Sequence, residues 1–170
     1  MTVHMAVVAI AAPLLAYAIA VPANVSPTIA SLVELVGVWL WHTPALHNAA
    51  RHDLPTYIAE QATFLLTGLL LWTAVLHRRA EGIIALLLTA MHMTLLGALI
   101  AMSPRPLYSH SQLDDQHLGG AIMLLVGGIV YLSGGLALSG DLLISTSPGR
   151  SARMPDPEAK APSRASSSPA

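Results

Sequence analysis

The sequence contains no cysteine and few charged residues. Without cysteine, the chain cannot form disulfides, zinc knuckles, iron–sulfur clusters or thiolate copper sites, and it cannot use a catalytic thiol. Only 10% of its 170 residues are charged, whereas a soluble domain carries about 25%. The composition therefore excludes a typical water-soluble domain, and any metal ion must be bound by His, Met, Asp or Glu.

Basic residues are also scarce, and they form no patch. Eight Lys and Arg stand against nine Asp and Glu, which gives a formal net charge of −1. A protein that binds nucleic acid needs clustered basic residues to neutralise phosphates. The sequence also lacks a Ser/His/Asp array, a phosphate-binding loop and an HExxH pattern. We therefore expect neither a nucleic-acid partner nor an enzyme.

Apolar residues make up most of the chain. Hydrophobic residues account for 54% of it, and its mean hydropathy is +0.62. A transmembrane helix needs about 20 predominantly apolar residues. Five segments meet or approach that length: residues 5–21, 27–41, 57–76, 82–102 and 118–138. The sequence thus predicts an all-α integral membrane bundle of about five transmembrane helices, none longer than one bilayer thickness, embedded in a lipid bilayer.

Local signals predict where these helices begin and end. Ser26 is a good N-cap, and Pro27 suits the first turn of the second segment. Pro44 disfavours continuation of that helix. Either Asp114 or Asp115 is suited to cap the last segment. In that last segment, paired glycines recur every seven or eight residues on one stripe, which predicts close packing against another helix.

The two ends of the chain differ in character. The first segment lacks the basic start of a secretory signal, so we expect it to be retained as a helix. From Ser145 onward the composition changes to Ser, Pro, Ala and Arg, which cannot bury enough apolar surface to fold. We therefore expect a transmembrane domain over residues 1–144 and a disordered tail over residues 145–170.

The distribution of basic residues predicts the orientation in the membrane. With five crossings, one side carries Arg51 and Arg105, and the other side carries Arg78, Arg79, Arg150, Arg153, Lys160 and Arg164. Cytoplasmic flanks are enriched in Lys and Arg. The C-terminus is therefore predicted to be cytoplasmic and the N-terminus external, and most histidines, His42 and His47 among them, then fall on the outer side.

Two histidines flank a helix-breaking proline on that outer side. In a continuous helix, residues five apart lie about 140° out of phase. His42 and His47 can therefore converge on one ion only if the helix ends near Pro44. The alternative is that Trp39 and Trp41 form an interfacial aromatic belt and that the histidines lie among the headgroups without a task.

Three further polar residues lie within apolar segments. His92 stands between Met91 and Met93, and imidazole with thioether ligands suits Cu(I), although methionines also serve as simple core filler. Glu34 and Glu60 are costly in a membrane unless they are protonated, paired or hydrated. Carboxylates near histidines orient metal ligands or relay protons, so we expect both to be functional.

Four stretches of the chain occur together in a known family. They are AAPLL at residues 11–15, WHTPALHNAA at 41–50, FLLTGLLLW at 64–72, and PLY at 106–108 followed by DDQHLGGAIM at 114–123. In this order and combination, the sequence resembles the CtaG-type polytopic membrane family of cytochrome c oxidase assembly factors. It departs from the family at Gln61, where the family tends to have a histidine, and it is shorter than most members.

The resemblance implies a multi-pass protein of the bacterial inner (plasma) membrane that assists maturation of a haem–copper oxidase and supplies copper to it, acting as a chaperone of the respiratory chain. The implied partner is a cytochrome c oxidase subunit. The polar residues that match the family are His42, His47, Glu60, Asp115 and Gln116.

Together these observations predict a copper site and leave two rival functions open. The predicted ligands are His42, His47, His92, Asp115, His117 and Glu60. One rival is a b-type haem electron carrier in which His92 is an axial ligand. The other is a structural helper of a respiratory complex that binds no metal. The sequence does not determine the oligomeric state.

Overall fold

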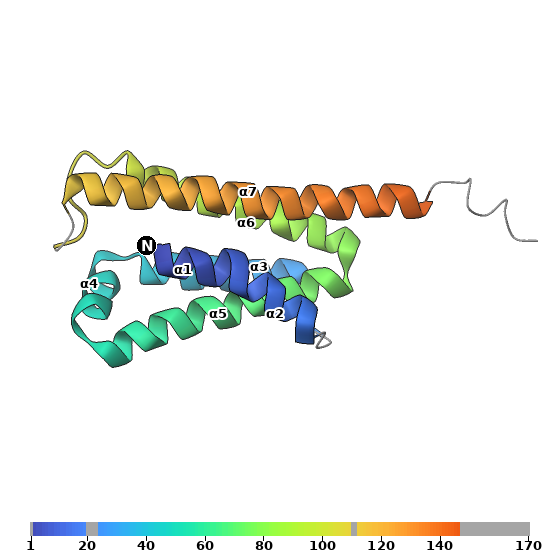
Figure 1. Cartoon of the computed structure of the whole chain (residues 1–170), viewed down its shortest axis with the longest axis horizontal. Helices are drawn as coiled ribbons and strands as arrows, with labels where there is room; N and C mark the ends of the chain where they lie inside the picture. Colours follow the sequence, from blue (N-terminus) through green and yellow to red (C-terminus); the bar gives the residue numbers. More distant parts are fainter. Residues whose placement is uncertain (1, 20–23, 110–111, 147–170) are drawn as a thin grey trace, which may run out of the picture.

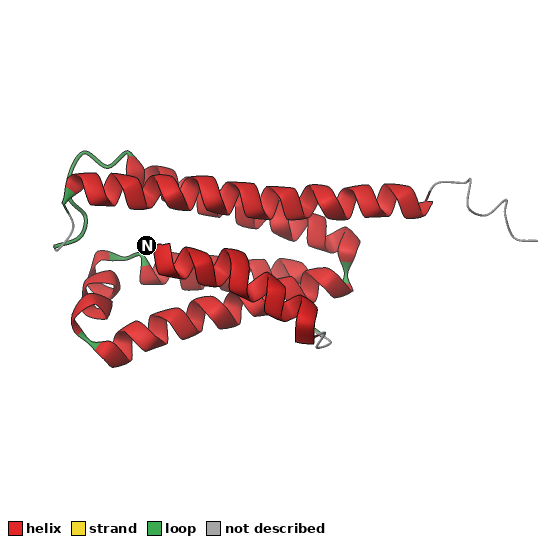
Figure 2. Ribbon diagram, in the orientation of Figure 1, coloured by secondary structure: helices red, strands yellow, loops and turns green. Residues whose placement is uncertain are grey.

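The computed structural model describes residues 2–19, 24–109 and 112–146. Its helices are α1 (Thr2–Ala6), η1 (Val7–Ala11), α2 (Ala12–Ile19), α3 (Pro27–Trp41), α4 (Pro44–His52), α5 (Leu54–His77), α6 (Arg79–Ala101) and α7 (Leu113–Thr146) (Figure 1). Within these residues there is no strand (Figure 2). The prediction of an all-helical fold is confirmed.

Three helices are long and apolar enough to cross a membrane: α5, α6 and α7. A fourth span is formed if α3 and α4 count as one broken span, since they are bent by 70° at the break between them. The N-terminal helix over Val3–Ile19 is apolar but shorter. The count of five transmembrane helices therefore stays a prediction.

The N-terminal helix changes its winding in the middle. Over η1 the helix is a π-helix, and the Ala12 N–H donates to the carbonyl oxygen of Val7. Pro13 follows directly and has no N–H to donate. A wider turn next to a proline is a common way to accommodate the missing hydrogen bond.

The predicted helix ends are partly confirmed. The Ser26 hydroxyl accepts a hydrogen bond from the Ile29 N–H, and Pro27 stands in the first turn of α3. As expected, α3 ends before Pro44, which begins the separate helix α4. The cap predicted for the last helix is wrong. Because α7 begins at Leu113, Asp114 and Asp115 lie inside its first turn rather than at its cap.

Helix α7 is longer than the sequence suggested. Its 34 residues extend about 51 Å at 1.5 Å per residue, beyond a hydrocarbon core of about 30 Å. The expectation that no helix exceeds one bilayer thickness is therefore wrong. The helix also includes Ser145, where the tail was expected to begin. Residues 147–170 lie outside the described residues, so the prediction of a disordered tail stays a prediction.

Helices α6 and α7 run side by side at unusually close range (Figure 1). A Cβ on Gly97 would lie 2.6 Å from the Leu124 backbone nitrogen, and one on Gly120 would lie 2.5 Å from that of Ala101. Only glycine leaves room for the facing backbone at these two positions. The predicted packing role of the glycine stripe is confirmed at Gly120.

Helices α3 and α5 and the N-terminal helix form the other side of the bundle (Figure 1). Glu34 of α3 is fully buried there, and its Oε1 accepts a hydrogen bond of 2.7 Å from the Tyr131 hydroxyl of α7. Nearby, the hydroxyls of Ser31 and Thr89 lie 2.8 Å apart and join α3 to α6. Glu34 thus has a hydrogen-bond partner in the core, and this bond connects α3 on one side of the bundle to α7 on the other.

Candidate functional site

Three histidines meet where α3 ends. His4 comes from α1, His42 caps the C-terminus of α3, and His47 lies in α4. The ring centroids of His4 and His42 are 5.1 Å apart, and those of His42 and His47 are 6.3 Å apart. All three side chains are buried, with exposed fractions of 3%, 6% and 5%. We call these three residues the histidine cluster.

The break between α3 and α4 creates this cluster. After Trp41 the chain leaves the helix, and Pro44 begins α4 in a direction 70° away. The bend brings His47 back toward His42, which a continuous helix does not allow. The condition set by the sequence, a helix end near Pro44, is therefore met, and the two side chains approach one another. That they converge on one ion stays a prediction.

The ring of His42 has a defined orientation. Its Nδ1 lies 2.7 Å from the carbonyl oxygen of Val38, one turn earlier in α3. Because a carbonyl oxygen only accepts, Nδ1 is the donor, and in a neutral ring Nε2 then carries the free lone pair. A histidine oriented in this way presents one nitrogen to a metal ion while the other holds the ring in place.

The free nitrogens of the cluster are buried. Among the described residues, His4 Nε2, His42 Nε2 and His47 Nδ1 have no hydrogen-bond partner, and neither does Glu60 Oε1. Most buried polar atoms in proteins are paired. Four unpaired ones at one end of a bundle are what a site for an exogenous ligand requires, and their donor types fit a transition-metal ion.

Glu60 lies on the same face of α5 as the aromatic residue that packs on the cluster. The ring of Phe64, one turn later, lies 5.1 Å from that of His4 and 6.0 Å from that of His42. Glu60 Oε2 accepts hydrogen bonds from Arg51 at 2.7 Å and from Gln61 at 3.0 Å. Arg51 therefore balances a carboxylate that is only 1% exposed.

The connection between α6 and α7 covers the cluster. The Tyr108 hydroxyl donates to the carbonyl oxygen of His42 at 3.1 Å, and burial raises the pKa of Tyr108 to about 12. Next to it, Asn48 and Ser109 exchange two hydrogen bonds. Gln116, one of the residues singled out by resemblance, is buried and accepts a 2.6 Å hydrogen bond from the Leu107 N–H. These contacts hold the connection against α4 and the end of α3.

The remaining predicted ligands have other surroundings. His117 donates a hydrogen bond from Nε2 to the carbonyl oxygen of Ser103, and Asp115 is exposed in the first turn of α7. His92 lies in α6, on the wall of a cavity beside α3. The structure thus brings His42 and His47 together. Glu60 contacts Arg51 of the same helix as His47, and His92, Asp115 and His117 have no contact with the two histidines among the interactions of the described residues.

Sequence reasoning missed His4 as a member of the site. It placed most histidines on the outer side but gave His4 no role, because no local sequence signal pairs residue 4 with residue 42. The available signal was the one used for His92, a histidine flanked by apolar residues, here Val3 and Met5. Arg51 and Tyr108 were missed too, since both reach the site through tertiary packing.

The side chains of the histidine cluster are not arranged as ligands of one ion in this structure. Across residues 2–19, 24–109 and 112–146, no three His, Asp or Glu side chains already surround one point in a metal-binding arrangement. The rings of the cluster are adjacent, but their free nitrogens do not converge. Binding of an ion at this place requires rotation of the side chains.

Comparison with known proteins now identifies the chain. The family model for the cytochrome c oxidase caa3 assembly factor (Caa3_CtaG) matches residues 1–143, which include the histidine cluster, Glu60 and most of α7. No curated protein and no solved structure matches the sequence. Because the match covers most of the chain, the protein belongs to the Caa3_CtaG family of cytochrome c oxidase caa3 assembly factors.

Proposed function

We propose that this family member is a non-enzymatic chaperone that binds copper transiently at the histidine cluster and transfers it to a subunit of the oxidase. Copper is the cargo of this protein. The observation that supports the proposal is the set of three buried imidazoles with unpaired nitrogens. Glu60, with an unpaired carboxylate oxygen, lies one turn before Phe64, whose ring packs on two of them. A purely structural helper has no need for such a group of unpaired atoms in its interior.

The spacing of the rings fits ligands of one ion. With metal–nitrogen bonds of about 2 Å, two imidazoles on the same ion place their ring centroids about 5–6 Å apart. The separations of 5.1 Å and 6.3 Å in the cluster are close to this range. These two spacings are therefore compatible with a shared ion once the free nitrogens of His4 and His47 turn toward His42 Nε2.

The chemistry of the donors fits transfer better than storage. Imidazole nitrogens bind copper, whereas the thiolates that hold it most tightly are absent from this chain. The Oε1 of Glu60 offers a fourth donor, and Arg51 holds the other carboxylate oxygen. A site of neutral imidazoles and one carboxylate is labile enough to give up its ion to a stronger site.

The distribution of basic residues supports an outward-facing cluster. Arg78 and Arg79 stand between α5 and α6, at the opposite end of α5 from Glu60. Because cytoplasmic flanks are enriched in Lys and Arg, this distribution favours a cluster near the outer surface of the bacterial inner membrane. We therefore propose an external N-terminus, a cytoplasmic C-terminus and delivery of copper from the outer side.

The haem-carrier alternative finds less support. A bis-histidine haem needs a second histidine facing His92 across the bundle. The residues that line the cavity at His92 include no other histidine. The copper proposal rests on a larger group of donors and is the one we retain.

Copper binding to the purified full-length protein tests the proposal. Under reducing conditions, with a chromophoric Cu(I) chelator as competitor, we expect one copper per chain and an affinity at least about tenfold lower in the His42→Ala/His47→Ala variant. His52→Ala is the matched control, because His52 lies at the exposed end of α4. In cells with limiting copper, the double variant should accumulate in the membrane while the oxidase loses copper. Full affinity and full oxidase activity in the double variant would favour the metal-free helper.

A further inference from the structure

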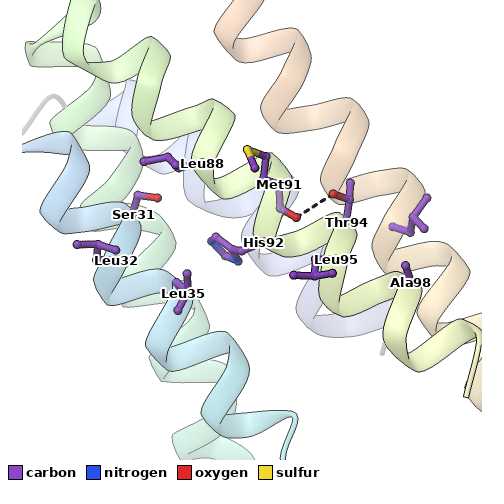
Figure 3. Close-up of a pocket in the computed structure, with 10 residues that line it drawn as sticks. Ser31, Leu32, Leu35, Leu88, Met91, His92, Thr94, Leu95 and Ala98 are labelled. Carbon is purple, nitrogen blue, oxygen red and sulfur yellow. Dashed lines mark hydrogen bonds between the residues drawn. The ribbon is translucent and has the colours of Figure 1, made fainter.

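A second site lies away from the histidine cluster, in a cavity between α3 and α6 (Figure 3). The cavity has a volume of 690 Å³, and most of its wall is leucine, methionine and alanine. Small-molecule sites in proteins are concave, largely apolar, and about 300–1,000 Å³ in size, with a few polar groups that fix the ligand. This cavity has that size and that lining.

His92 supplies the polar group. Its ring projects from α6 into the space beside α3 (Figure 3), and the side chain is only 6% exposed. Among the described residues, neither Nδ1 nor Nε2 of His92 has a hydrogen-bond partner. A neutral imidazole has one donor and one acceptor, and burying both unpaired is unfavourable. The cavity therefore contains an unsatisfied group that a ligand can pair.

The position of His92 restricts the ligand to molecules that dissolve in hydrocarbon. His92 lies close to the middle of α6, which is long and apolar enough to span a membrane. At that depth a lipid phosphate or a water-soluble anion is excluded. No residue that lines the cavity carries a formal charge. A haem would bring two propionates for which the lining offers no cation.

Two other polar residues line the cavity, Ser31 and Thr94, and both hydroxyls are already hydrogen-bonded. The Ser31 hydroxyl lines the cavity and lies 2.8 Å from that of Thr89. The Thr94 hydroxyl donates to the carbonyl oxygen of Ala90 at 2.8 Å. Of the three polar lining residues, His92 is therefore the one whose polar atoms have no hydrogen-bond partner among the described residues. Met91, also in the lining, has a thioether that packs well against the face or edge of a ring.

We propose that this cavity binds a neutral, membrane-soluble ring compound of the quinone class, with a carbonyl or hydroxyl oxygen hydrogen-bonded to His92. A carbonyl accepts from the protonated ring nitrogen, and a hydroxyl donates to the other one. An acyl chain fills the same volume but leaves both nitrogens unpaired. The inference is independent of the copper proposal, because none of the lining residues belongs to the histidine cluster.

The full-length protein in nanodiscs of synthetic phosphatidylcholine tests this proposal. Decylubiquinone is the probe, and dodecylbenzene, which has an alkyl chain and a ring but no oxygen, is the control compound. We expect a saturable rise in unfolding temperature of about 5 °C with decylubiquinone. We expect no such rise with dodecylbenzene.

Two variants locate the effect. His92→Phe keeps a ring but removes both nitrogens, and Ala98→Phe keeps His92 but fills part of the cavity. Both should lose the rise in unfolding temperature, whereas His52→Phe, at the end of α4, should keep it. If His92→Phe does not fold, Ala98→Phe still decides the question. An equal response to both compounds, or an unchanged response in a folded cavity variant, would overturn the proposal.

Analysis of the protein as purified from membranes gives the native occupant. Extraction with organic solvent should recover about one quinone per chain from the wild type and much less from Ala98→Phe. A Soret band in the wild type that is lost in His92→Phe would identify haem instead and would overturn the proposal. Recovery of phospholipid alone would also overturn it.

Discussion

The ring of Tyr108 lies against the ring of His47, with their centroids 4.0 Å apart. The same side chain donates its hydroxyl hydrogen to the carbonyl oxygen of His42. One residue of the α6–α7 connection thus contacts both histidines that flank the helix break. His42 and His47 are therefore held in place by a segment that lies more than 60 positions after them in the sequence.

Replacement of Tyr108 separates its two contacts. Tyr108→Phe removes only the hydrogen bond and should lower the free energy of unfolding by about 1 kcal/mol. Tyr108→Ala also removes the ring from a buried position, with an expected loss of about 3 kcal/mol. Chemical denaturation in detergent measures both values. Equal losses in the two variants would show that the ring packing contributes nothing.

The stability of the protein should also depend on Tyr108 at high pH. Burial raises the pKa of its phenol from 10.0 to about 12. A raised pKa means that the folded state favours the neutral phenol, so its contribution is complete below pH 10 and is lost as the pH rises toward 12. Tyr108→Phe should lose less stability than the wild type between pH 10 and pH 12. If the free energy of unfolding falls by the same amount in the two proteins over this pH range, the raised pKa of Tyr108 is contradicted.

Gly120 and Gly140 provide a matched pair in one helix. A Cβ on Gly120 would lie 2.5 Å from the Ala101 backbone nitrogen, whereas a Cβ on Gly140 would meet nothing within 4 Å. Gly120→Ala should therefore push α7 away from α6 and cost about 2 kcal/mol. Gly140→Ala should be neutral or stabilise by up to about 1 kcal/mol, since alanine favours helix. Unfolding of both variants in the same detergent tests the comparison.

Arg51 and Glu60 form an ion pair in which only the arginine reaches solvent. Arg51→Ala leaves the buried carboxylate without its cation and should cost about 2 kcal/mol of stability. In the double variant Arg51→Ala/Glu60→Gln, the buried charge is gone, so the total loss should be smaller than the sum of the single losses. A double-mutant cycle of unfolding free energies measures the difference, and strict additivity would show that the pair is uncoupled.

The membrane orientation can be read with single cysteines, because the natural sequence has none. Ala49 in α4 and Ala80 in α6 are both exposed, and they lie in the helices that flank the two opposite ends of α5. In intact spheroplasts, Ala49→Cys should react with a membrane-impermeant thiol reagent, and Ala80→Cys should react only after the membrane is opened. The reverse pattern would place the histidine cluster on the cytoplasmic side and remove it from the route of externally delivered copper.

The features that sequence predicted best are those fixed by neighbouring residues. The bounds of α3 follow from a serine cap, a proline in the first turn and a proline that begins the next helix, and all three signals act within a few positions. The meeting of His42 and His47 follows from the same break. Such features need no knowledge of how the helices pack.

The features that sequence missed depend on tertiary packing. His4 joins the site only because the N-terminal helix packs against the end of α3, and Tyr108 only because a loop folds over α4. Conversely, His117 was expected to bind metal because it lies near the end of the last helix that is predicted to face outward, yet it donates to a backbone carbonyl. Depth in the membrane is readable from hydropathy, but the direction of a side chain around its helix is set by its neighbours.

His4 and His117 therefore distinguish the copper site proposed from the structure from the one expected from sequence. His4→Ala removes a cluster member whose Nε2 is buried and unpaired, so Cu(I) affinity should fall by about tenfold or more. His117→Ala removes a ring that is already bonded to Ser103, and copper affinity should stay within about twofold of the wild type. Chelator competition on the purified variants measures both. The opposite ranking, with His117→Ala weak and His4→Ala unchanged, would move the copper site from the histidine cluster to the start of α7.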